Sequence, residues 1–521
     1  MKQKMITGYE AAALIPDGSS VALSGFIGFG LAEEVLCAVE RLFLETGHPK
    51  GINLISVAGL GGDGKNRGFN HFGHPGMVGR LYASNLSKAD KLARLVYENV
   101  FPAYLVPQGV LAEMFRAIAG KKPGVISRAG LRTFVDPRIE GGRANQAAYE
   151  AGREVVEVIE LQGEEYLFYP AFLVDVALIK GTVCDEQGNM ACGKEALRLE
   201  QFEMAAAAKS CGGLVIAQVE NMVKNGEIHP KQVEVPGSLI DYFVLAQGEN
   251  KRQQFAVEKP YEASWAGNAK VVLEEMEPME MGIRKVIARR AAREIRDGDF
   301  VNLGIGMPDG ISRVLCEEGR IGKVTLSVES GVIGGVPAGG LALGAAYNPE
   351  AILPQADMFT LYDGGKIDVA CLGGAQFDMD GNVNVSKFNG KVTGPGGFIN
   401  ITQNAKKVCF AGSFTAGNLK VRICGGKLAI EREGTIRKFL RKIEQITFSG
   451  KYAVDKAHQE VVIVTERAVF KLTQKGLMLT EIAPGIDLQK DILEQMEFSP
   501  LIAKDLKLMD SELFYDARLK K

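Results

Sequence analysis

Apolar positions along this chain follow two alternating patterns, one typical of buried strands and one typical of amphipathic helices. Short apolar runs such as SVALSG and FVNLGIG, which begin at Ser20 and Phe300, have the length and composition of buried strands. Each run leads through a glycine-rich turn into a helix-like segment, LAEEVLCAVERLF or GISRVLCEEG. Because the two patterns alternate, we expect α/β domains whose sheets are mostly parallel.

The chain also carries a diverged internal repeat. A shift of 280 positions aligns Glu10–Leu23 with Arg290–Leu303 and matches seven of fourteen residues. A shift of 193 positions aligns Val174–Asn189 with Ile367–Asn382, and the two matches keep the same order. We therefore predict two similar, open, mostly parallel α/β domains.

The two shifts differ, and the difference indicates where the halves differ in length. The fall from 280 to 193 positions gives the first copy 87 extra residues, which we expect near residues 100–160. The composition changes to mixed charge and methionine between Val257 and Lys285, which predicts the join. From Val461, the sequence predicts two strands around a Lys-Gly turn and then a helical tail. The predicted domains are 1–270 and 280–521.

Composition narrows the class of function. The chain has 521 residues, with 61 Lys and Arg against 63 Asp and Glu and no long block of one sign. This balance argues against a nucleic-acid or polybasic membrane partner and favours small-molecule chemistry. No apolar run reaches the roughly 18 to 20 residues of a membrane-spanning helix. The eight cysteines are scattered and no apolar leader is apparent, so we expect a cytoplasmic protein.

Glu329 is the strongest candidate for chemistry. It ends the strand-like run KVTLSVE and opens the glycine-rich turn SGVIGGVPAGG, and α/β enzymes place functional groups where strands end. A carboxylate with few charge partners nearby in sequence is costly to bury unless it has a function. In the repeat its counterpart is Ala58, which indicates a role performed once per chain. The structural alternatives are a helix N-cap or a buried ion pair.

Several motifs resemble those of the class I coenzyme A transferases. The segments NLGIGMP from Asn302 and SVESG around Glu329 resemble the family's catalytic half. SGFIGFGLAEEVL, LVPQGVLAEMFRA around Gln108, FVDPRIEGGRAN and GPGGFINI from Gly394 also fit. The resemblance covers nearly the whole chain. It is strongest to the single-chain subgroup that contains acetate and propionate CoA-transferases.

The resemblance implies a role for each motif. Glu329 would be the nucleophile that attacks an acyl-CoA thioester and then carries CoA as a glutamyl thioester. The Gln108 side chain and the backbone N–H groups of Gly396 and Gly397 would stabilise the oxyanions. The remaining expected CoA-binding residues are Asn302, Gly304, Ile305, Gly306, Met307 and Asn382.

The implied activity is transfer of CoA from a short-chain acyl-CoA to another short-chain carboxylate by a ping-pong mechanism. Acids of the acetate, propionate and acetoacetate type are expected. Coenzyme A is then a substrate, and no separate cofactor is expected. The family also implies a homo-oligomer, with a tetramer as one option. The alternatives are an acyl-CoA hydrolase that uses the same glutamate and a non-catalytic, ligand-sensing α/β protein.

Two further motifs favour structural roles. His71 and His74 have a spacing that could bind a metal, but two ligands without a clear third more often form a polar lining, so no metal site is expected. The DxxGN motifs that begin at Asp185 and Asp378 resemble Asx turns between strands, and their duplication indicates a structural role.

Overall fold

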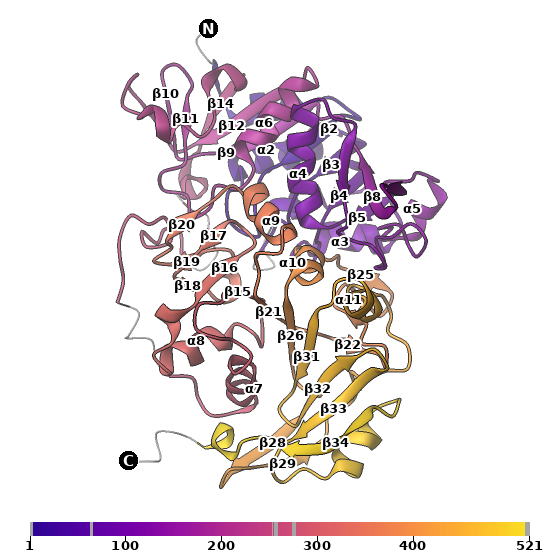
Figure 1. Ribbon diagram of the computed structural model, residues 1–521. Helices are drawn as coiled ribbons and strands as arrows, with labels where there is room; N and C mark the ends of the chain where they lie inside the picture. Colours follow the sequence, from indigo (N-terminus) through magenta and orange to yellow (C-terminus); the bar gives the residue numbers. More distant parts are fainter. Residues whose placement is uncertain (1–3, 63–65, 253, 255–258, 273–277, 516–521) are drawn as a thin grey trace. The chain divides into compact units, whose positions relative to one another are not determined.

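The computed structural model describes residues 4–62, 66–252, 254, 259–272 and 278–515. The chain forms two compact units (Figure 1). Unit 1 comprises Met1–Val271, Glu329–Thr360 and Lys391–Asn400; unit 2 comprises Val272–Val328, Leu361–Gly390 and Ile401–Lys521. The domain boundaries at 270 and 280 stay a prediction. The expected join at Val257–Lys285 lies partly outside the described residues.

Unit 1 is built on an eight-stranded sheet in which every neighbouring pair is parallel. Most residues of its central strands are apolar and buried, as the interior of a parallel sheet requires. In spatial order they are β1 (Lys4–Ile6), β14 (Tyr242–Leu245), β12 (Leu214–Val219), β9 (Val176–Lys180), β2 (Ser20–Leu23), β3 (Ile52–Ile55), β4 (Val78–Ala83) and β5 (Ala103–Leu105).

Helices cover both faces of this sheet. One apolar core joins alternate strand residues, such as Val21, Leu54 and Leu81, to helices on one face. These are α1 (Gly8–Ala13), α2 (Glu33–Thr46), the 3₁₀ helix η1 (Gly68–Phe72) and α3 (Asp90–Tyr97). A second pair, α4 (Gln108–Ala119) and α6 (Gln201–Ser210), packs together, and α6 contacts β9 and β12. The expected α/β class is confirmed.

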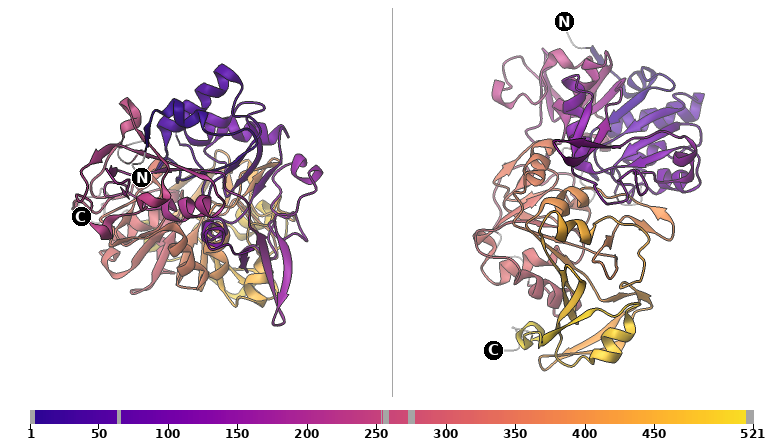
Figure 2. Two further views of the ribbon diagram at one scale, coloured as in Figure 1. Left: turned by 90° about the horizontal axis from the view of Figure 1, so that it is seen from above. Right: turned by 45° about the vertical axis from the view of Figure 1, so that its right-hand side comes forward.

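The first half has the longer connection between the strands matched in the repeat. The strands β4 and β5 extend the first sheet past β3, and the position of the extra residues near 100–160 stays a prediction. A three-stranded sheet of β6 (Gly124–Ser127), β8 (Glu164–Pro170) and β7 (Glu157–Leu161) follows, with α5 (Gln146–Glu150) between β6 and β7. The β7–β8 hairpin is purple in Figure 2.

Unit 2 repeats the parallel core and adds an antiparallel part. The order is β16 (Thr325–Val328), β15 (Phe300–Leu303), β21 (Val369–Leu372), β26 (Lys407–Ala411) and β31 (Glu460–Val464), all parallel to their neighbours. The sheet continues through β32 (Ala468–Thr473), β33 (Gly476–Ile482) and β34 (Leu501–Leu508). The helices α7 (Ile283–Ala292) and α8 (Gly310–Glu317) pack against each other.

The two cores have the same strand order, so the internal repeat is a structural one. The first runs β14-β12-β9-β2-β3 and the second runs β31-β26-β21-β15-β16. The strand register corrects one detail. Val21 lies beside Leu54, and Val301 lies beside Leu326, so counting three residues onward pairs Glu329 with Val57 and not with Ala58. Both candidates are apolar, and the carboxylate therefore occurs only in the second copy.

The C-terminal region differs from its prediction. The strands β32 and β33 form the expected hairpin around the Lys-Gly turn. The expected helical tail is wrong, because the chain makes short π and 3₁₀ turns between Leu488 and Gln495 and then forms β34, which pairs with β33 in parallel. That pairing joins residues more than twenty positions apart, and a local sequence pattern does not report it.

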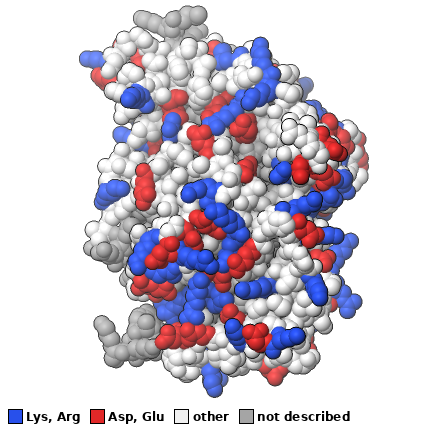
Figure 3. Space-filling view, in the orientation of Figure 1, with Lys and Arg blue, Asp and Glu red and all other residues white. Residues whose placement is uncertain are grey.

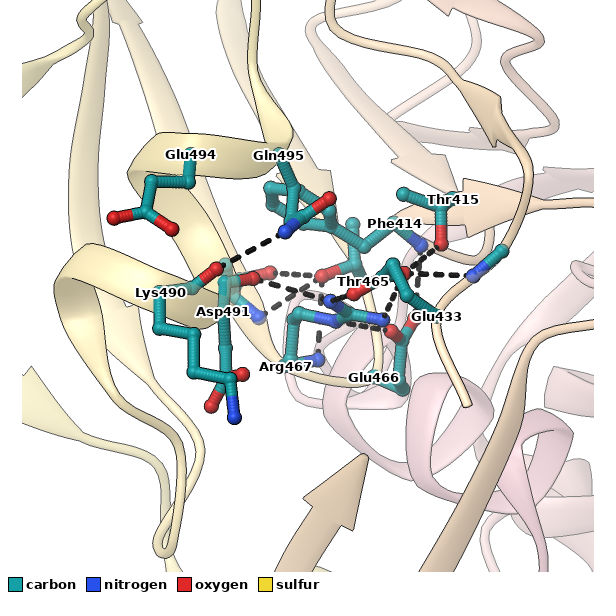
Figure 4. A network of polar contacts seen from close by, with 12 residues as sticks. Phe414, Thr415, Glu433, Thr465, Glu466, Arg467, Lys490, Asp491, Glu494 and Gln495 are labelled. Carbon is teal, nitrogen blue, oxygen red and sulfur yellow. Dashed lines mark hydrogen bonds and ion pairs between the residues drawn. The ribbon is translucent and has the colours of Figure 1, made fainter. Parts of the chain in front are cut away.

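A buried polar network supports this part of unit 2 (Figure 4). Arg467 is fully buried and donates from Nε to Glu466 at 2.7 Å and from Nη1 to Glu433 at 2.7 Å. Its Nη1 also donates to the Asp491 carbonyl at 3.1 Å, and Glu466 accepts from the Phe414 N–H at 2.9 Å. The Arg467 guanidinium therefore links the turns before β34 to the chain segment between β31 and β32.

The surface agrees with the charge balance of the sequence. On the face shown in Figure 3, Lys and Arg side chains are interspersed with Asp and Glu. No helix in the described ranges combines the length and the apolar character needed to cross a membrane.

Candidate active site

Glu329 lies directly after β16 and is half-buried. Burial raises the pKa of its carboxyl group above the ordinary value of a glutamate. No charged neighbour in the described part of the chain contributes to this shift. The chain continues into β17 (Val332–Ile333) and not into a helix. Neither the N-cap nor the ion-pair alternative therefore accounts for this residue.

The turn after Glu329 requires glycine. Gly331 has a φ of 114°, and a Cβ atom there would lie 2.1 Å from the Leu353 carbonyl oxygen. The Leu353 N–H donates to the Gly331 carbonyl at 2.8 Å, and Ser330 Oγ donates to the Gly344 carbonyl at 2.5 Å. These bonds fix the backbone on which the carboxylate is carried.

The segment that Glu329 opens is held within unit 1. The Gln355 N–H donates to the Leu199 carbonyl at 3.0 Å, at the start of α9 (Gln355–Asp363). Asp357 pairs with Arg116 of α4 at 2.7 Å. The ring of Tyr347 meets Trp265 edge-on, with ring centroids 5.8 Å apart. Glu329 thus belongs to the same compact unit as the helix that begins at Gln108.

Gln108 is the first residue of α4 and is only 2% exposed. Its backbone N–H donates to the Gly396 carbonyl at 3.1 Å. Its side-chain Nε2 has no hydrogen-bond partner among the residues that the structure describes. A buried donor without a partner costs roughly 1–3 kcal/mol, which is tolerated where a ligand or intermediate accepts the bond. Gln108 therefore has a buried amide donor that is free to bind a ligand, and its expected oxyanion role stays a prediction.

The GPGG loop lies against Gln108, but one of its two expected donors is occupied. The Gly396 N–H donates to the Ser84 carbonyl at 2.9 Å, so it does not point into open space as the oxyanion role requires. A built Cβ on Gly396 would lie 3.8 Å from Gln108 Oε1, so the backbone approaches the amide closely. Gly397, the next residue, stays a predicted donor.

Asn400 also contributes to this arrangement. The sequence analysis did not select it as a candidate site residue. It lies in α10 (Phe398–Asn404), and its Oδ1 accepts from the Gly109 N–H at 3.0 Å. It therefore binds the start of α4 to the loop before α10. Its segment, GPGGFINI, is one of the motifs that resemble the family, whereas nothing in the sequence distinguishes Ser84.

The expected CoA loop at the end of β15 separates into a buried and an exposed part. Asn302 is fully buried, and its Nδ2 donates to the Ser327 carbonyl at 3.2 Å and to Tyr362 Oη at 3.1 Å. These contacts brace the β15–β16 pair, but Asn302 Oδ1 has no hydrogen-bond partner among the described residues, so the expected contact with CoA stays a prediction. Ile305 is 55% exposed, so its side chain is accessible to a ligand.

The rest of this loop is also accessible. Gly304 and Met307 are half-buried, and Gly306 is exposed with a φ of 88°. Arg284 donates to the Gly306 carbonyl at 2.8 Å, which places a guanidinium beside the loop. Sequence reasoning did not select Arg284, whose guanidinium also pairs with the Asp309 carboxylate. Binding of CoA by this loop stays a prediction.

Asn382 has a structural role that its repeat partner shares. Its Nδ2 donates to Asp378 at 2.9 Å, and its Oδ1 accepts from the Gly450 N–H at 3.0 Å. Asn189 makes the corresponding bonds to Asp185 at 2.9 Å and from the Gly237 N–H at 3.1 Å. The predicted Asx turns are confirmed. Because both ends of the Asn382 amide are engaged, the contacts give no support to its expected proximity to CoA.

The two histidines of HFGH lie in a buried polar cluster. His71 is 2% exposed, and His74 contacts Glu40 at 2.7 Å. Burial lowers the pKa of His71, but hydrogen bonds with Cys37, Glu33 and Glu40 outweigh it and raise the pKa to about 11. The sequence analysis expected a polar environment for the histidines. It did not predict Cys37 and Glu33 as their neighbours, because both precede the histidines by more than thirty residues.

A family model matches segments of both units. The model described as Coenzyme A transferase matches residues 6–246 and 284–493. The caffeate CoA-transferase of Acetobacterium woodii is 46% identical over 516 residues, which cover 98% of this chain and 97% of that protein. The acetate CoA-transferase YdiF of Escherichia coli K12 is 40% identical over 99% of this chain and 96% of that protein.

A solved structure extends the similarity to three dimensions. The crystal structure of the acyl-CoA transferase YdiF of Escherichia coli O157:H7, in a thioester complex with CoA, matches with a TM-score of 0.92 and 39% identity. The match covers 99% of this chain and 97% of that one. Sequence and fold therefore agree over nearly the whole chain, and this protein belongs to the coenzyme A transferase family.

Proposed function

We propose that this chain transfers CoA from a short-chain acyl-CoA to another short-chain carboxylate through a glutamyl-CoA thioester at Glu329. The observation that carries the proposal is the half-buried carboxyl group of Glu329, which has no charged partner among the described residues, in the same compact unit as the unpaired amide donor of Gln108. Relatives named as CoA-transferases, one of them solved as a thioester complex with CoA, support it.

The first half-reaction proceeds in two attacks. The ionised Glu329 attacks the thioester carbonyl, which forms an acyl-glutamyl anhydride and releases CoA thiolate. The thiolate then attacks the glutamyl carbonyl, so the donor acid leaves as its carboxylate and CoA is held as a glutamyl thioester. An incoming carboxylate reverses both steps and leaves as the new acyl-CoA. Because the donor carboxylate leaves before the acceptor carboxylate enters, ping-pong kinetics follow.

Each attack places negative charge on a carbonyl oxygen. The Gln108 amide can donate to one such oxygen without first breaking a bond in the protein, because its Nε2 has no partner among the described residues. The Gly397 N–H is the second proposed donor. Gly396 contributes close approach of the backbone, since its own N–H is engaged by Ser84.

Peptide mapping tests the covalent intermediate. The purified protein is incubated with acetyl-CoA or propionyl-CoA without acceptor, digested, and analysed by mass spectrometry for a CoA adduct. We expect the adduct on the peptide that contains Glu329, and its loss in Glu329→Gln. Glu350→Gln is the matched control, because Glu350 is an exposed carboxylate in the same segment of unit 1.

The outcomes separate the candidate functions. An unlabelled wild-type protein whose Glu329→Ala variant keeps its transferase turnover would refute the mechanism. Release of free CoA at the same rate with and without an added acid would indicate a hydrolase. A panel of short-chain acids, tested as acceptors, then defines the substrate range.

A further inference from the structure

A group of metal-binding side chains lies at the start of α2, outside the residues assigned to CoA transfer. Glu33 and Cys37 are one helical turn apart and therefore share a face of α2. His71, from η1, meets them with its Nε2 at 2.9 Å from Glu33 Oε2 and 3.7 Å from Cys37 Sγ. The three ligand atoms all lie within 4.8 Å of one another.

A second layer of hydrogen bonds orients these three side chains. Glu33 Oε1 accepts from the Gly68 N–H at 2.7 Å, which directs Oε2 toward His71. Glu40 Oε2 lies 2.7 Å from His71 Nδ1, and the other Glu40 oxygen lies 2.7 Å from His74 Nε2. A carboxylate on the far nitrogen of a histidine is the usual outer support of a zinc ligand, because it fixes the ring and presents Nε2 to the metal.

The separations suit one small divalent ion. With a Zn–S bond of about 2.3 Å and a Zn–N bond of about 2.05 Å, tetrahedral geometry places sulfur and nitrogen about 3.6 Å apart. Cys37 Sγ and His71 Nε2 are 3.7 Å apart. The corresponding nitrogen-to-oxygen separation is about 3.3 Å, so the Glu33 carboxylate would move back by about 0.4 Å on binding. That movement is within the freedom of a glutamate side chain.

We propose that Glu33, Cys37 and His71 form a binding site for one Zn²⁺-type cation, with solvent as the fourth ligand. The ion would join the first turns of α2 to η1, two elements of unit 1 that otherwise meet through side-chain packing and hydrogen bonds. The site is separate from the proposed transfer reaction, and it stands or falls without it. The competing occupant is a proton, in which case His71 donates from both ring nitrogens to Glu33 and Glu40.

Cobalt titration tests the site directly. The full-length protein, freed of metal with a chelator, is titrated with Co²⁺, whose thiolate complexes absorb in the near ultraviolet. We expect one equivalent to bind, with a thiolate-to-cobalt band that added Zn²⁺ abolishes. Cys37→Ser should weaken binding at least tenfold and remove the band. Cys211→Ser is the control, because Cys211 is a partly exposed cysteine at the end of α6.

Alkylation of the wild-type protein gives a second measurement that does not depend on a variant that folds. Zn²⁺ should slow the reaction of Cys37 with iodoacetamide at least tenfold and leave that of Cys211 unchanged. No uptake of Co²⁺ or Zn²⁺ by the wild type, equal uptake by Cys37→Ser, or an unchanged alkylation rate of Cys37 would overturn the proposal in favour of the protonated cluster.

Discussion

Glu329 combines two properties that oppose each other in a nucleophile. Burial raises its pKa, which keeps it protonated to higher pH than an exposed glutamate, but a carboxylate that is poorly solvated is more reactive once ionised. Only the ionised form can attack, so the rate of the first half-reaction should rise with pH through the raised pKa and then level off. Rapid measurement of CoA thiolate release against pH checks this.

The position of the inflection decides between two environments for this carboxyl group. An inflection above the ordinary value for glutamate agrees with the buried environment. A flat profile down to that value would show that Glu329 is hydrated in solution or that another group performs the attack.

Gln108 should affect turnover more than binding. Its unpaired Nε2 donor gains a full partner only when an oxyanion forms, so Gln108→Ala should lower kcat by about 10²- to 10³-fold and leave KM nearly unchanged. Steady-state kinetics with saturating acceptor measure both constants. A change confined to KM would instead assign Gln108 to substrate binding.

At the level of strands and turns, the buried guanidinium of Arg467 should be the most sensitive polar position in unit 2. Arg467→Met leaves Glu466 buried without its partner, which costs about 3–5 kcal/mol when one member of a buried pair is removed. Thermal unfolding should begin several degrees lower than in the wild type. Arg422→Met is the control, since Arg422 is 70% exposed and its ion pair with Glu431 spans 3.7 Å. Equal effects of both substitutions would contradict this interpretation of the network.

The sequence predicted the elements that arise from local patterns. Buried parallel strands have continuous apolar runs, so β2, β15 and the repeat can be recognised from the order of residues alone. The β34 strand cannot, because its pairing with β33 depends on residues distant in the chain. The exact repeat partner of Glu329 was missed by one position for a related reason. Register is a property of two strands and not of one sequence motif.

The candidate site shows the same limit. Glu329 and Gln108 could be selected from motifs, but the direction of the Gly396 N–H could not, because it depends on where Ser84 is brought by the fold. Asn302 shows why the contacts of both amide atoms are needed. Its Nδ2 braces the fold through Ser327 and Tyr362, whereas its Oδ1 has no partner among the described residues, so its expected role in CoA binding stays a prediction.

For the molecule as a whole, the division into units differs from the division of the sequence into halves. Two segments of the second half, Glu329–Thr360 and Lys391–Asn400, belong to unit 1. A fragment of residues 1–270 would lack the partners of Gly109 and Leu86, which are bonded to Asn400 and Thr393. We expect this fragment to aggregate or to bind 8-anilinonaphthalene-1-sulfonate strongly, because apolar surface is uncovered.

Co-expression with residues 280–521 should restore a soluble unit 1, as judged by size-exclusion chromatography and loss of dye binding. A fragment of residues 1–270 that is monodisperse and resists protease as well as the full chain would show that the two later segments are dispensable for this unit.

The placement of the two later segments also limits how such genes can recombine. A crossover near the join would give unit 1 a first half from one ancestor, while Glu329–Thr360 and Lys391–Asn400 came from the other. The pairs Arg116 with Asp357 and Gly109 with Asn400 would then be inherited separately. Functional chimaeras should therefore be those in which both parents agree at these contacts.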